Sequence, residues 1–175
     1  GFGIVPVVMG LFGIGEILIN VEAKAGGVFA AQVRSLLPSR RDLKASTAPI
    51  ARGTLIGFVL GLIPGVGAIV PTFISYAVER RLSKTPQKFG TGMIEGVAGP
   101  ETANNAYANA ALIPLFTLGI PSSPTTAILM GAFMMNGLVP GPMLFKEHGE
   151  FAWAVIASLY VGNAILVILN LPLIP

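Results

Sequence analysis

The chain has 175 residues, of which 53% are hydrophobic and only 11% carry a charge. Its mean hydropathy of +0.77 excludes an ordinary soluble domain and predicts an integral membrane protein. The formal net charge of +3 comes mainly from residues 24–52 and 80–88, so it indicates topology rather than a surface for nucleic acid. The absence of cysteine excludes a disulfide framework and a cysteine-ligated metal site. Gly1 lies inside an apolar run, and we expect the chain to be a fragment of a longer protein.

Two helices are predicted before the first long uncharged run. Residues 1–19 predict a membrane helix whose start is cut, with Glu16 near the end that meets the first basic stretch. Residues 28–51 predict an amphipathic helix on the cytoplasmic surface, because apolar residues recur at helical spacing opposite polar ones. Pro49 is expected to limit the length of this second helix.

Residues 54–78 form an apolar run without charge that is long enough to cross a bilayer, yet basic residues stand at both of its ends. Arg52 precedes the run, and residues 80–88 follow it. Because Lys and Arg collect in cytoplasmic loops, both ends are expected on the same face of the membrane. The run is therefore predicted to enter the membrane and turn back as a re-entrant helical hairpin.

The turn of this hairpin is predicted at Pro64, Gly65 and Gly67, because proline removes a backbone donor and glycine accepts dihedral angles that other residues resist. Each arm would then have roughly 10 residues and reach about 15 Å into the bilayer, to its midplane. Broken backbone at that depth is tolerated only where protein or a water-filled cavity surrounds it. The hairpin thus indicates a site for transport or for an ion.

A broken membrane helix is predicted over residues 94–138, with its interruption at Gly119–Pro124. It begins at a basic loop and ends before residues 146–150, a short loop with little positive excess that fits the outer face. It would therefore cross the membrane once, as two half-helices of the kind that secondary transporters use. Residues 151–171 are uncharged and long enough to span the bilayer as a last membrane helix.

Four parts of the chain are expected at the midplane: the hairpin tip, the interruption, the hydroxyls that follow it and a polar face on the first half-helix. On that face Glu101, Asn105 and Asn109 recur every four residues. Polar side chains are costly against lipid, so the face should turn inward. The predicted substrate-binding residues are Pro64, Gly65, Val66, Gly67, Asn104, Asn105, Ser122, Ser123, Thr125 and Thr126. The predicted ion-coupling residues are Gly65, Gly67, Glu101, Asn105, Gly119 and Ser122.

Two of these assignments have structural alternatives. The asparagines could serve only to hydrogen-bond between helices and hold a bundle together. Glu101 follows Pro100, a favoured first residue of a helix, so its carboxylate could simply begin a helix near the surface. Both alternatives stay open at the level of the sequence.

Ser122 and Ser123 invite comparison with serine hydrolases, but the chain's single histidine, His148, lies in a loop assigned to the outer face. A serine without a nearby base is not activated as a nucleophile, so no enzyme activity is expected. Residues 64–67 do not form a phosphate loop, because no Gly-Lys-Ser or Gly-Lys-Thr follows them. No cofactor is predicted.

No Lys or Arg falls at the predicted midplane. An anion there would be held by backbone N–H groups, hydroxyls and the N-termini of half-helices that begin at about Ala68 and about Thr125. Such helix ends carry only about half a charge each, so a bound cation is the expected partner. Na+ coordinated by the carbonyl groups of the broken helices fits that role.

Short motifs along the whole chain resemble the large membrane subunit of the tripartite tricarboxylate transporter family. Members of that family are longer than this chain, which is similar to the part after their middle. The motifs are GLFGIGE at 10–16, SLLPS at 35–39, GLIPGVGA at 61–68, YAVERRLSK at 76–84, FG at 89–90, IEGVAGPE at 94–101 with NN at 104–105, LGIP at 118–121 and GLVPGP at 137–142.

This resemblance implies a multi-pass subunit of a bacterial inner membrane that works with a small membrane subunit and a periplasmic solute-binding protein. It implies secondary active transport of di- or tricarboxylates such as citrate, with Na+ or H+ as the coupling ion. It also implies an all-α membrane fold that forms one half of an inverted-repeat, elevator-type carrier. Family members commonly have Gly and a small residue after Ile-Pro, whereas this chain has Ser122, Ser123 and Pro124, so the substrate stays open. The alternative function is a channel or a structural membrane subunit without coupled transport.

Overall fold

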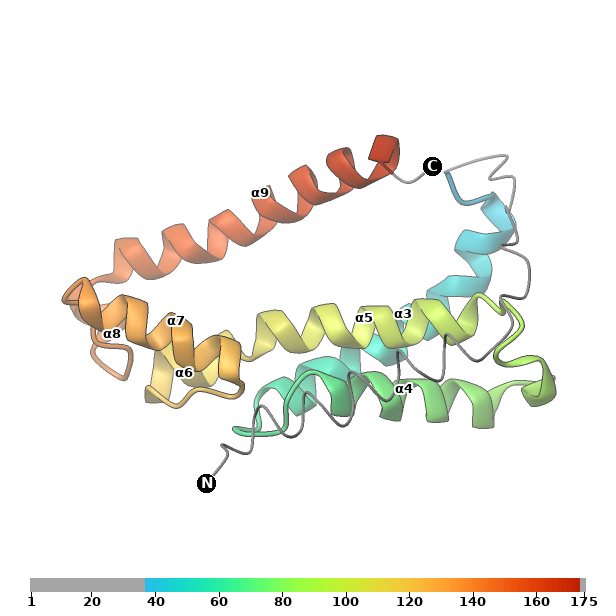
Figure 1. Cartoon of the computed structure of the whole chain (residues 1–175), viewed down its shortest axis with the longest axis horizontal. Coiled ribbons are helices and arrows are strands. Elements are labelled where there is room, and N and C mark those ends of the chain that lie inside the picture. The colour runs from blue at the N-terminus through green and yellow to red at the C-terminus, as the bar shows by residue number, and fades with distance from the viewer. Residues whose placement is uncertain (1–36, 174–175) are drawn as a thin grey trace, which may run out of the picture. The chain divides into compact units, whose positions relative to one another are not determined.

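The computed structural model describes residues 37–173, all of which belong to one compact unit, Ser35–Pro175. The predicted helix over residues 1–19 and the first part of the predicted surface helix lie outside the described residues. Within residues 37–173 the regular structure is helical throughout (Figure 1). The helices are α3 (Arg40–Gly61), α4 (Ile69–Leu82), η2 (Pro86–Lys88), α5 (Glu95–Ala110), α6 (Leu112–Leu118), α7 (Pro124–Met135), α8 (Leu144–Glu147) and α9 (Gly149–Leu173).

Helix α3 begins at a capping box. The Ser39 hydroxyl accepts a hydrogen bond from the Asp42 N–H at 3.2 Å, and the Asp42 carboxylate accepts one from the Ser39 N–H at 3.0 Å, so two otherwise unpaired backbone donors are satisfied. Hydrogen bonds from the Ser39 side chain and backbone hold the pKa of Asp42 below its ordinary value. The chain is thus committed to a helix well before the predicted hairpin.

The boundary predicted between a surface helix and the first hairpin arm is wrong. Helix α3 runs without interruption from Arg40 to Gly61, through Pro49 and through residues 51–54. Pro49 lies on the buried face of the helix, and that face continues to Gly61, so close packing along its whole length outweighs the backbone hydrogen bond that proline removes.

The buried face of α3 is made of small residues that let two helix backbones approach closely. A Cβ added to Gly57 would overlap the Ala103 carbonyl oxygen, and one added to Gly61 would lie 2.6 Å from the Ala110 Cβ, so α3 lies directly against α5. Small residues at such contacts are typical of helices that associate inside membranes. The residues of this face are Ser46, Pro49, Gly53, Gly57 and Gly61.

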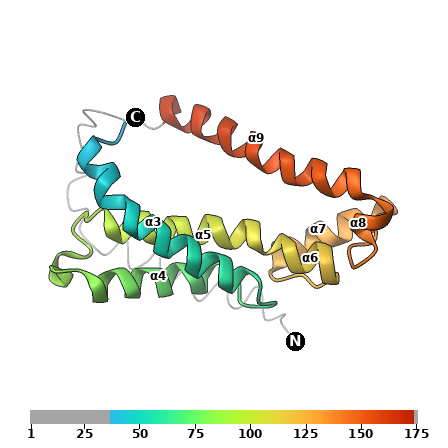
Figure 2. The same ribbon diagram turned by 180° about the vertical axis from the view of Figure 1, so that it is seen from behind.

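Helix α4 packs on α5 in the same way. Its buried face comprises Pro71, Ser75 and Glu79, and a Cβ added to Gly99 of α5 would lie 3.1 Å from the Ser75 Oγ. Figures 1 and 2, seen from opposite sides, both show α3, α4 and α5 lying side by side. The three helices form a block in which glycine, alanine and serine replace the large apolar side chains of a soluble core.

The chain turns between α3 and α4 at residues 62–68, where the turn was predicted. Gly65 has a φ of 84° and Gly67 a φ of 76°, values that favour glycine, so the predicted turn at these two residues is confirmed. The predicted arms of roughly 10 residues each are wrong, however, because α3 has 22 residues and α4 has 14. At the helical rise these lengths correspond to about 33 Å and about 21 Å.

A second packed cluster joins α6, α7, α8 and α9. It is built from aromatic and branched side chains, with ring centroids 5.9 Å apart for Phe116 and Phe133 and 5.2 Å apart for Phe133 and Phe151. The rings of Phe133 and Phe151 meet edge to face at 87°, a geometry that adds to the free energy gained by burial. The buried members of the cluster are Leu115, Phe116, Phe133, Leu144 and Ala152.

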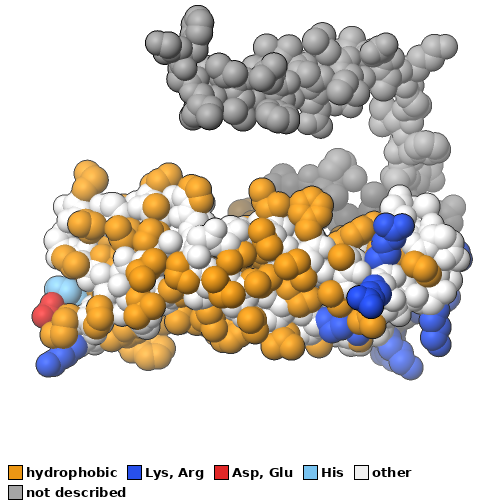
Figure 3. All heavy atoms as spheres, turned by 90° about the horizontal axis from the view of Figure 1, so that it is seen from below, with side chains coloured by type: hydrophobic (Ala, Val, Ile, Leu, Met, Phe, Trp, Pro, Cys, Tyr) orange, Lys and Arg blue, Asp and Glu red, His pale blue; other side chains and the backbone are white. Residues whose placement is uncertain are grey.

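Helix α9 matches the last predicted membrane helix. Its segment Gly149–Leu169 is the one stretch among the described residues that is long and apolar enough to cross a membrane as a single helix. Figure 3 shows hydrophobic side chains spread over the described surface and Lys and Arg gathered mainly at one end. Those exposed cations come from the start of α3 and the region from the end of α4 to η2, namely Arg40, Arg41, Lys44, Arg80, Arg81, Lys84 and Lys88.

Candidate functional site

The predicted interruption of the long helix is present between α6 and α7. Helix α6 ends at Leu118, and its C-cap Gly119 has a left-handed φ of 68° and donates its N–H to the Leu115 carbonyl at 3.0 Å. Helix α7 begins at Pro124. The intervening residues 119–123, which we call the α6–α7 loop, coincide with the predicted interruption.

Two of the predicted binding hydroxyls cap helix α7. The Ser123 Oγ accepts a hydrogen bond from the Thr126 N–H at 3.2 Å, and the Thr126 hydroxyl accepts one from the Ser123 N–H at 2.8 Å. Proline at the first position completes a favourable helix start. These two side chains are therefore already engaged in the fold, whereas Thr125, between them, is exposed.

Ser122 differs from its neighbours. Its side chain is only 1% exposed, and its Oγ is one of two buried side-chain oxygens without a hydrogen-bond partner among the described residues. The Ser122 carbonyl oxygen accepts a hydrogen bond from the Tyr107 hydroxyl at 3.0 Å. A buried hydroxyl left unpaired costs about 1–3 kcal/mol, so this oxygen is the clearest candidate for binding something outside the chain.

Tyr107 was missed by the sequence reasoning. It lies on α5 and is 1% exposed, and a single tyrosine at a helix position carries no pattern that would separate it from a packing residue. Spacing offered only a weak clue, because Tyr107 lies on the face of α5 that also buries Ala103 and Ala110.

The α6–α7 loop also rests on the segment after α7. A Cβ added to Gly119 would lie 2.6 Å from the Pro140 carbonyl oxygen, and the Gly141 N–H donates to the Phe116 carbonyl at 3.2 Å. The turn at Pro140–Pro142, which the sequence placed at the far end of the broken helix, is thus a neighbour of the interruption.

The hairpin tip is an open backbone segment. Pro64 and Gly65 are exposed, Val66 and Gly67 are half-buried, and a Cβ added to either glycine would meet no atom of the described residues within 4 Å. Helix α4 starts after the tip with Ala68 as its N-cap, which supplies no side-chain hydrogen bond. The first N–H groups of α4 are thus left without a side-chain cap.

The tip and the α6–α7 loop lie at the same end of α5, as Figures 1 and 2 both show. Gly61, the last residue of α3, packs against the turn of α5 that contains Tyr107 and Ala110. The structure therefore places two of the predicted loops near one part of α5.

The polar face of α5 points away from α3 and α4. Glu101, Asn104, Asn105 and Asn109 are all exposed within the described part of the chain. The Asn105 side chain donates to the Glu101 carbonyl at 3.0 Å, and the Asn109 side chain donates to the Asn105 carbonyl at 2.8 Å. Within residues 37–173 these two amides bond to their own helix and do not join helices, which was the alternative considered for them.

The alternative for Glu101, a helix start, is wrong. Helix α5 begins at Glu95, and Pro100 lies inside it and is buried. The residues before Pro100 are small and fit closely against α4, as Gly99 shows through its contacts with Ser75 and Glu79. Packing thus extends the helix backwards past the proline, and Glu101 is an interior residue of the polar face.

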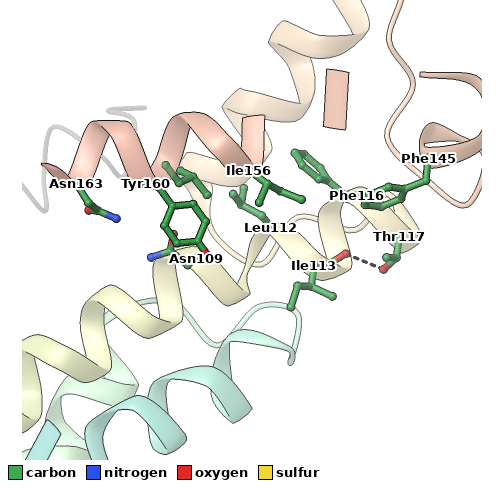
Figure 4. A pocket seen from close by; sticks show the side chains of 10 residues that line it. Asn109, Leu112, Ile113, Phe116, Thr117, Phe145, Ile156, Tyr160 and Asn163 are labelled. Carbon is green, nitrogen blue, oxygen red and sulfur yellow. Dashed lines mark hydrogen bonds between the residues drawn. The ribbon is translucent and has the colours of Figure 1, made fainter. Parts of the chain in front are cut away.

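An apolar pocket of about 460 Å³ lies beside the end of α5, against α6, α8 and α9. Figure 4 shows Asn109, Tyr160 and Asn163 at its polar edge and Phe116 and Phe145 on its apolar side. Of the predicted polar face it contains only Asn109, and it contains neither the tip nor the loop residues. Its apolar lining does not suit a carboxylate.

The basic end of the helical block contains an ion pair between a partly exposed arginine and a buried glutamate. The Arg52 Nε donates to Glu79 Oε1 at 2.7 Å and a second nitrogen of the same guanidinium donates to Oε2, while the Glu79 side chain is 1% exposed. Arg52, which precedes the predicted hairpin in the sequence, lies within α3, and Glu79 lies within α4. The pair therefore connects these two helices.

The donor set of the candidate site is made of oxygen atoms and backbone groups. Within residues 37–173 no group of three His, Asp or Glu side chains is arranged to hold a metal ion. A monovalent cation at the tip and the α6–α7 loop would thus be held by carbonyl and hydroxyl oxygens, and an anion by N–H groups and hydroxyls.

Comparison with known proteins gives one family and two curated relatives. A profile of the tripartite tricarboxylate transporter TctA family matches residues 1–175. An "uncharacterized 52.8 kDa protein in TAR-I ttuC' 3'region" of Agrobacterium vitis is 46% identical over 99% of this chain and 35% of its own length. An "uncharacterized protein in TAR-II ttuC' 3'region" of the same organism is 53% identical over 67% of this chain and 49% of its own length.

The chain thus spans between about a third and a half of the length of these relatives. No solved structure matches it. The family match covers every residue, including the interruption at 119–123 and the hairpin tip, and it confirms the resemblance drawn from the short motifs. The chain belongs to the tripartite tricarboxylate transporter TctA family.

Proposed function

We propose that this chain forms part of the membrane subunit of a secondary carrier that moves small di- or tricarboxylates, citrate-like in charge, across the bacterial inner membrane. Na+ or H+ would be the coupling ion, and a small membrane subunit and a periplasmic solute-binding protein would be the partners. Family membership supports transport in general. The single observation that carries the proposal is the buried, unpaired Ser122 Oγ in a loop that interrupts a helix.

The chemistry of the loop favours the cation at Ser122. A buried hydroxyl oxygen beside unwound backbone is the kind of ligand that coupling ions take in carriers with broken helices. The carboxylate fits the more exposed groups, which are the Thr125 hydroxyl and the tip around Gly65 and Gly67. Helix α4 has 14 residues and α7 has 12, and their positive ends would favour a negative charge between them.

The length of α4 and that of the uncharged end of α3 support a re-entrant hairpin. Helix α3 as a whole measures about 33 Å, but it carries Arg52 and only residues 53–61 follow that charge before the tip. At about 21 Å, α4 is too short to cross a hydrocarbon core of about 30 Å, and its last turn carries Arg80 and Arg81. The charges Arg40, Arg41 and Lys44 lie at the opposite end of the other arm from the tip. With both basic ends on the cytoplasmic face, the tip at residues 62–68 would stand within the membrane.

The remaining parts of the proposal follow from this arrangement. The polar face of α5, exposed here, would be covered in the longer protein, because such side chains are costly against lipid. An elevator-type carrier would need a second half with inverted topology, and this chain spans only 35% of one relative. The alternative, a channel or a structural subunit, shares the broken helix but does not require a tight cation site.

The test is uptake into vesicles that contain the full-length protein and its partner subunits. Labelled di- and tricarboxylates are offered with and without Na+ for the wild type and for Ser122→Ala. Because Ser122 Oγ makes no hydrogen bond within the described chain, its removal should not destabilise the fold. A hydroxyl that binds a charged ion contributes about 1.5 kcal/mol. Its removal in Ser122→Ala should therefore weaken the apparent affinity for the cation about tenfold.

The matched control is Ser75→Ala. Ser75 carries the other buried, unpaired hydroxyl, but it lies inside α4 against Gly99 and far from any interruption in its own helix. This variant should transport like the wild type. Unchanged cation and substrate affinities in Ser122→Ala would remove the α6–α7 loop from the site. Dissipation of a substrate gradient without exchange of labelled for unlabelled carboxylate would favour a channel.

A further inference from the structure

Tyr107 supports the α6–α7 loop from outside it. The tyrosine lies on α5, is 1% exposed, and donates its hydroxyl hydrogen to the Ser122 carbonyl at 3.0 Å. At its start the loop is held by the Ile120 N–H on the Pro114 carbonyl, and at its end by the Ser123 and Thr126 cap. Between these points, Ser122 accepts its hydrogen bond from the Tyr107 hydroxyl.

The same turn of α5 also supports the hairpin. A Cβ added to Gly61 would lie 2.9 Å from the Tyr107 carbonyl oxygen and 2.6 Å from the Ala110 Cβ, so the end of α3 lies directly on this turn. Residue 62, the first of the tip, follows immediately. The backbone of Tyr107 thus contacts the end of α3, which leads into the hairpin tip. Its side chain contacts the α6–α7 loop.

We propose that Tyr107 is a positioning residue that fixes the α6–α7 loop relative to the hairpin tip, so that both loops hold the cation and the carboxylate in one geometry. This inference rests on the proposed transport function. The hydrogen bond restrains the carbonyl of the residue whose Oγ is unpaired, so a shift of the carbonyl moves the Oγ with it. Because the side chain is buried and phenylalanine keeps its ring, the hydroxyl can be removed while the volume of the ring is retained.

The experiment compares Tyr107→Phe with the wild type in the full-length complex in vesicles. The phenylalanine keeps the ring and loses the hydrogen bond. We expect the apparent affinities for the carboxylate and for the coupling cation to weaken together, each about fivefold, the loss that one neutral hydrogen bond produces. The maximum rate per molecule should stay near that of the wild type. Hydrogen exchange at the backbone of residues 119–126 should become faster.

The control is Tyr76→Phe. Within the described residues the Tyr76 hydroxyl makes no hydrogen bond, and its ring contacts Phe89 with a centroid distance of 5.4 Å. This variant should match the wild type in its apparent affinities for the carboxylate and the cation and in the rate of hydrogen exchange at residues 119–126.

Three outcomes decide the matter. Weakened affinities at an unchanged maximum rate support the positioning role. If the wild type transports and Tyr107→Phe has unchanged affinities, the positioning role is overturned. This holds even if the abundance of the protein or its maximum rate falls, because a purely structural residue would change only abundance and maximum rate. A wild-type complex that exchanges no labelled carboxylate across the vesicle membrane overturns the proposed function itself. In that case the hydrogen-exchange measurement still tests Tyr107: an unchanged hydrogen-exchange rate at residues 119–126 in Tyr107→Phe would overturn the support of the loop by Tyr107.

Discussion

The contact between α3 and α5 predicts that one methyl group at Gly57 will separate two helices. A Cβ at this position would overlap the Ala103 carbonyl oxygen and would lie 2.9 Å from the Ala103 Cα, whereas ordinary contacts begin near 3.4 Å. The two backbones would have to move apart by more than about 0.5 Å, as the difference between those two values requires. Gly53 and Gly61 line the same contact, so the displacement would loosen the interface on both sides. Overpacking of this kind costs about 1–3 kcal/mol.

The assay is thermal unfolding of the purified full-length protein in detergent, with Gly57→Ala compared with Gly162→Ala. At Gly162 on α9 an added Cβ meets no described atom within 4 Å, and alanine favours a helix over glycine by about 1 kcal/mol. Each kcal/mol shifts the melting temperature by about 2–4 °C in a domain of about 150–250 residues and by less in a longer protein. Gly57→Ala should therefore melt measurably below the wild type and Gly162→Ala at or above it. Equal melting of the two variants would refute close packing of α3 on α5.

The ion pair and the topology lead to two further predictions. Arg52→Gln leaves the Glu79 carboxylate buried without its partner and should lower stability, by less than the 3–5 kcal/mol of a fully buried pair because the Arg52 side chain is 36% exposed. Adding Glu79→Gln should restore part of the loss in the same melting assay, and a purely additive double variant would contradict the coupling. For topology, Lys44→Cys and Lys84→Cys should both be shielded from a membrane-impermeant thiol reagent applied outside the cell, and Glu147→Cys should react. Labelling of Lys44→Cys and Lys84→Cys from opposite faces would contradict the re-entrant hairpin.

Several features were readable from the sequence because their causes are local. The positive φ values of Gly65, Gly67 and Gly119 arise in short segments that also contain Pro64 or Pro121, and the backbone preference of glycine is a property of the residue itself. The length of α9 follows from an uninterrupted apolar run. The integral membrane character follows from composition alone.

Other features depended on which segments lie together. Pro49 was expected to limit a helix and Pro100 was one of two possibilities considered for a helix start, yet both lie inside helices and are buried, since contacts between α3, α4 and α5 outweigh a local preference. The partners of Arg52 and of Tyr107 are 27 and 15 residues away in the chain, beyond the reach of any helical or strand period.

The candidate site shows the same division. The sequence by itself determined that a run of hydroxyls follows a helix interruption near Gly119, because residue types and turn preferences are sufficient for that. Only the tertiary structure decided which hydroxyls are used by the fold. Ser123 and Thr126 cap α7, and Thr125 is exposed. The Ser122 Oγ is buried and has no hydrogen-bond partner among the described residues, while the Ser122 carbonyl accepts a hydrogen bond from Tyr107. The physical reason is that hydrogen-bond satisfaction depends on groups brought close in space, whereas the tendency to break a helix depends on the residues next in the chain.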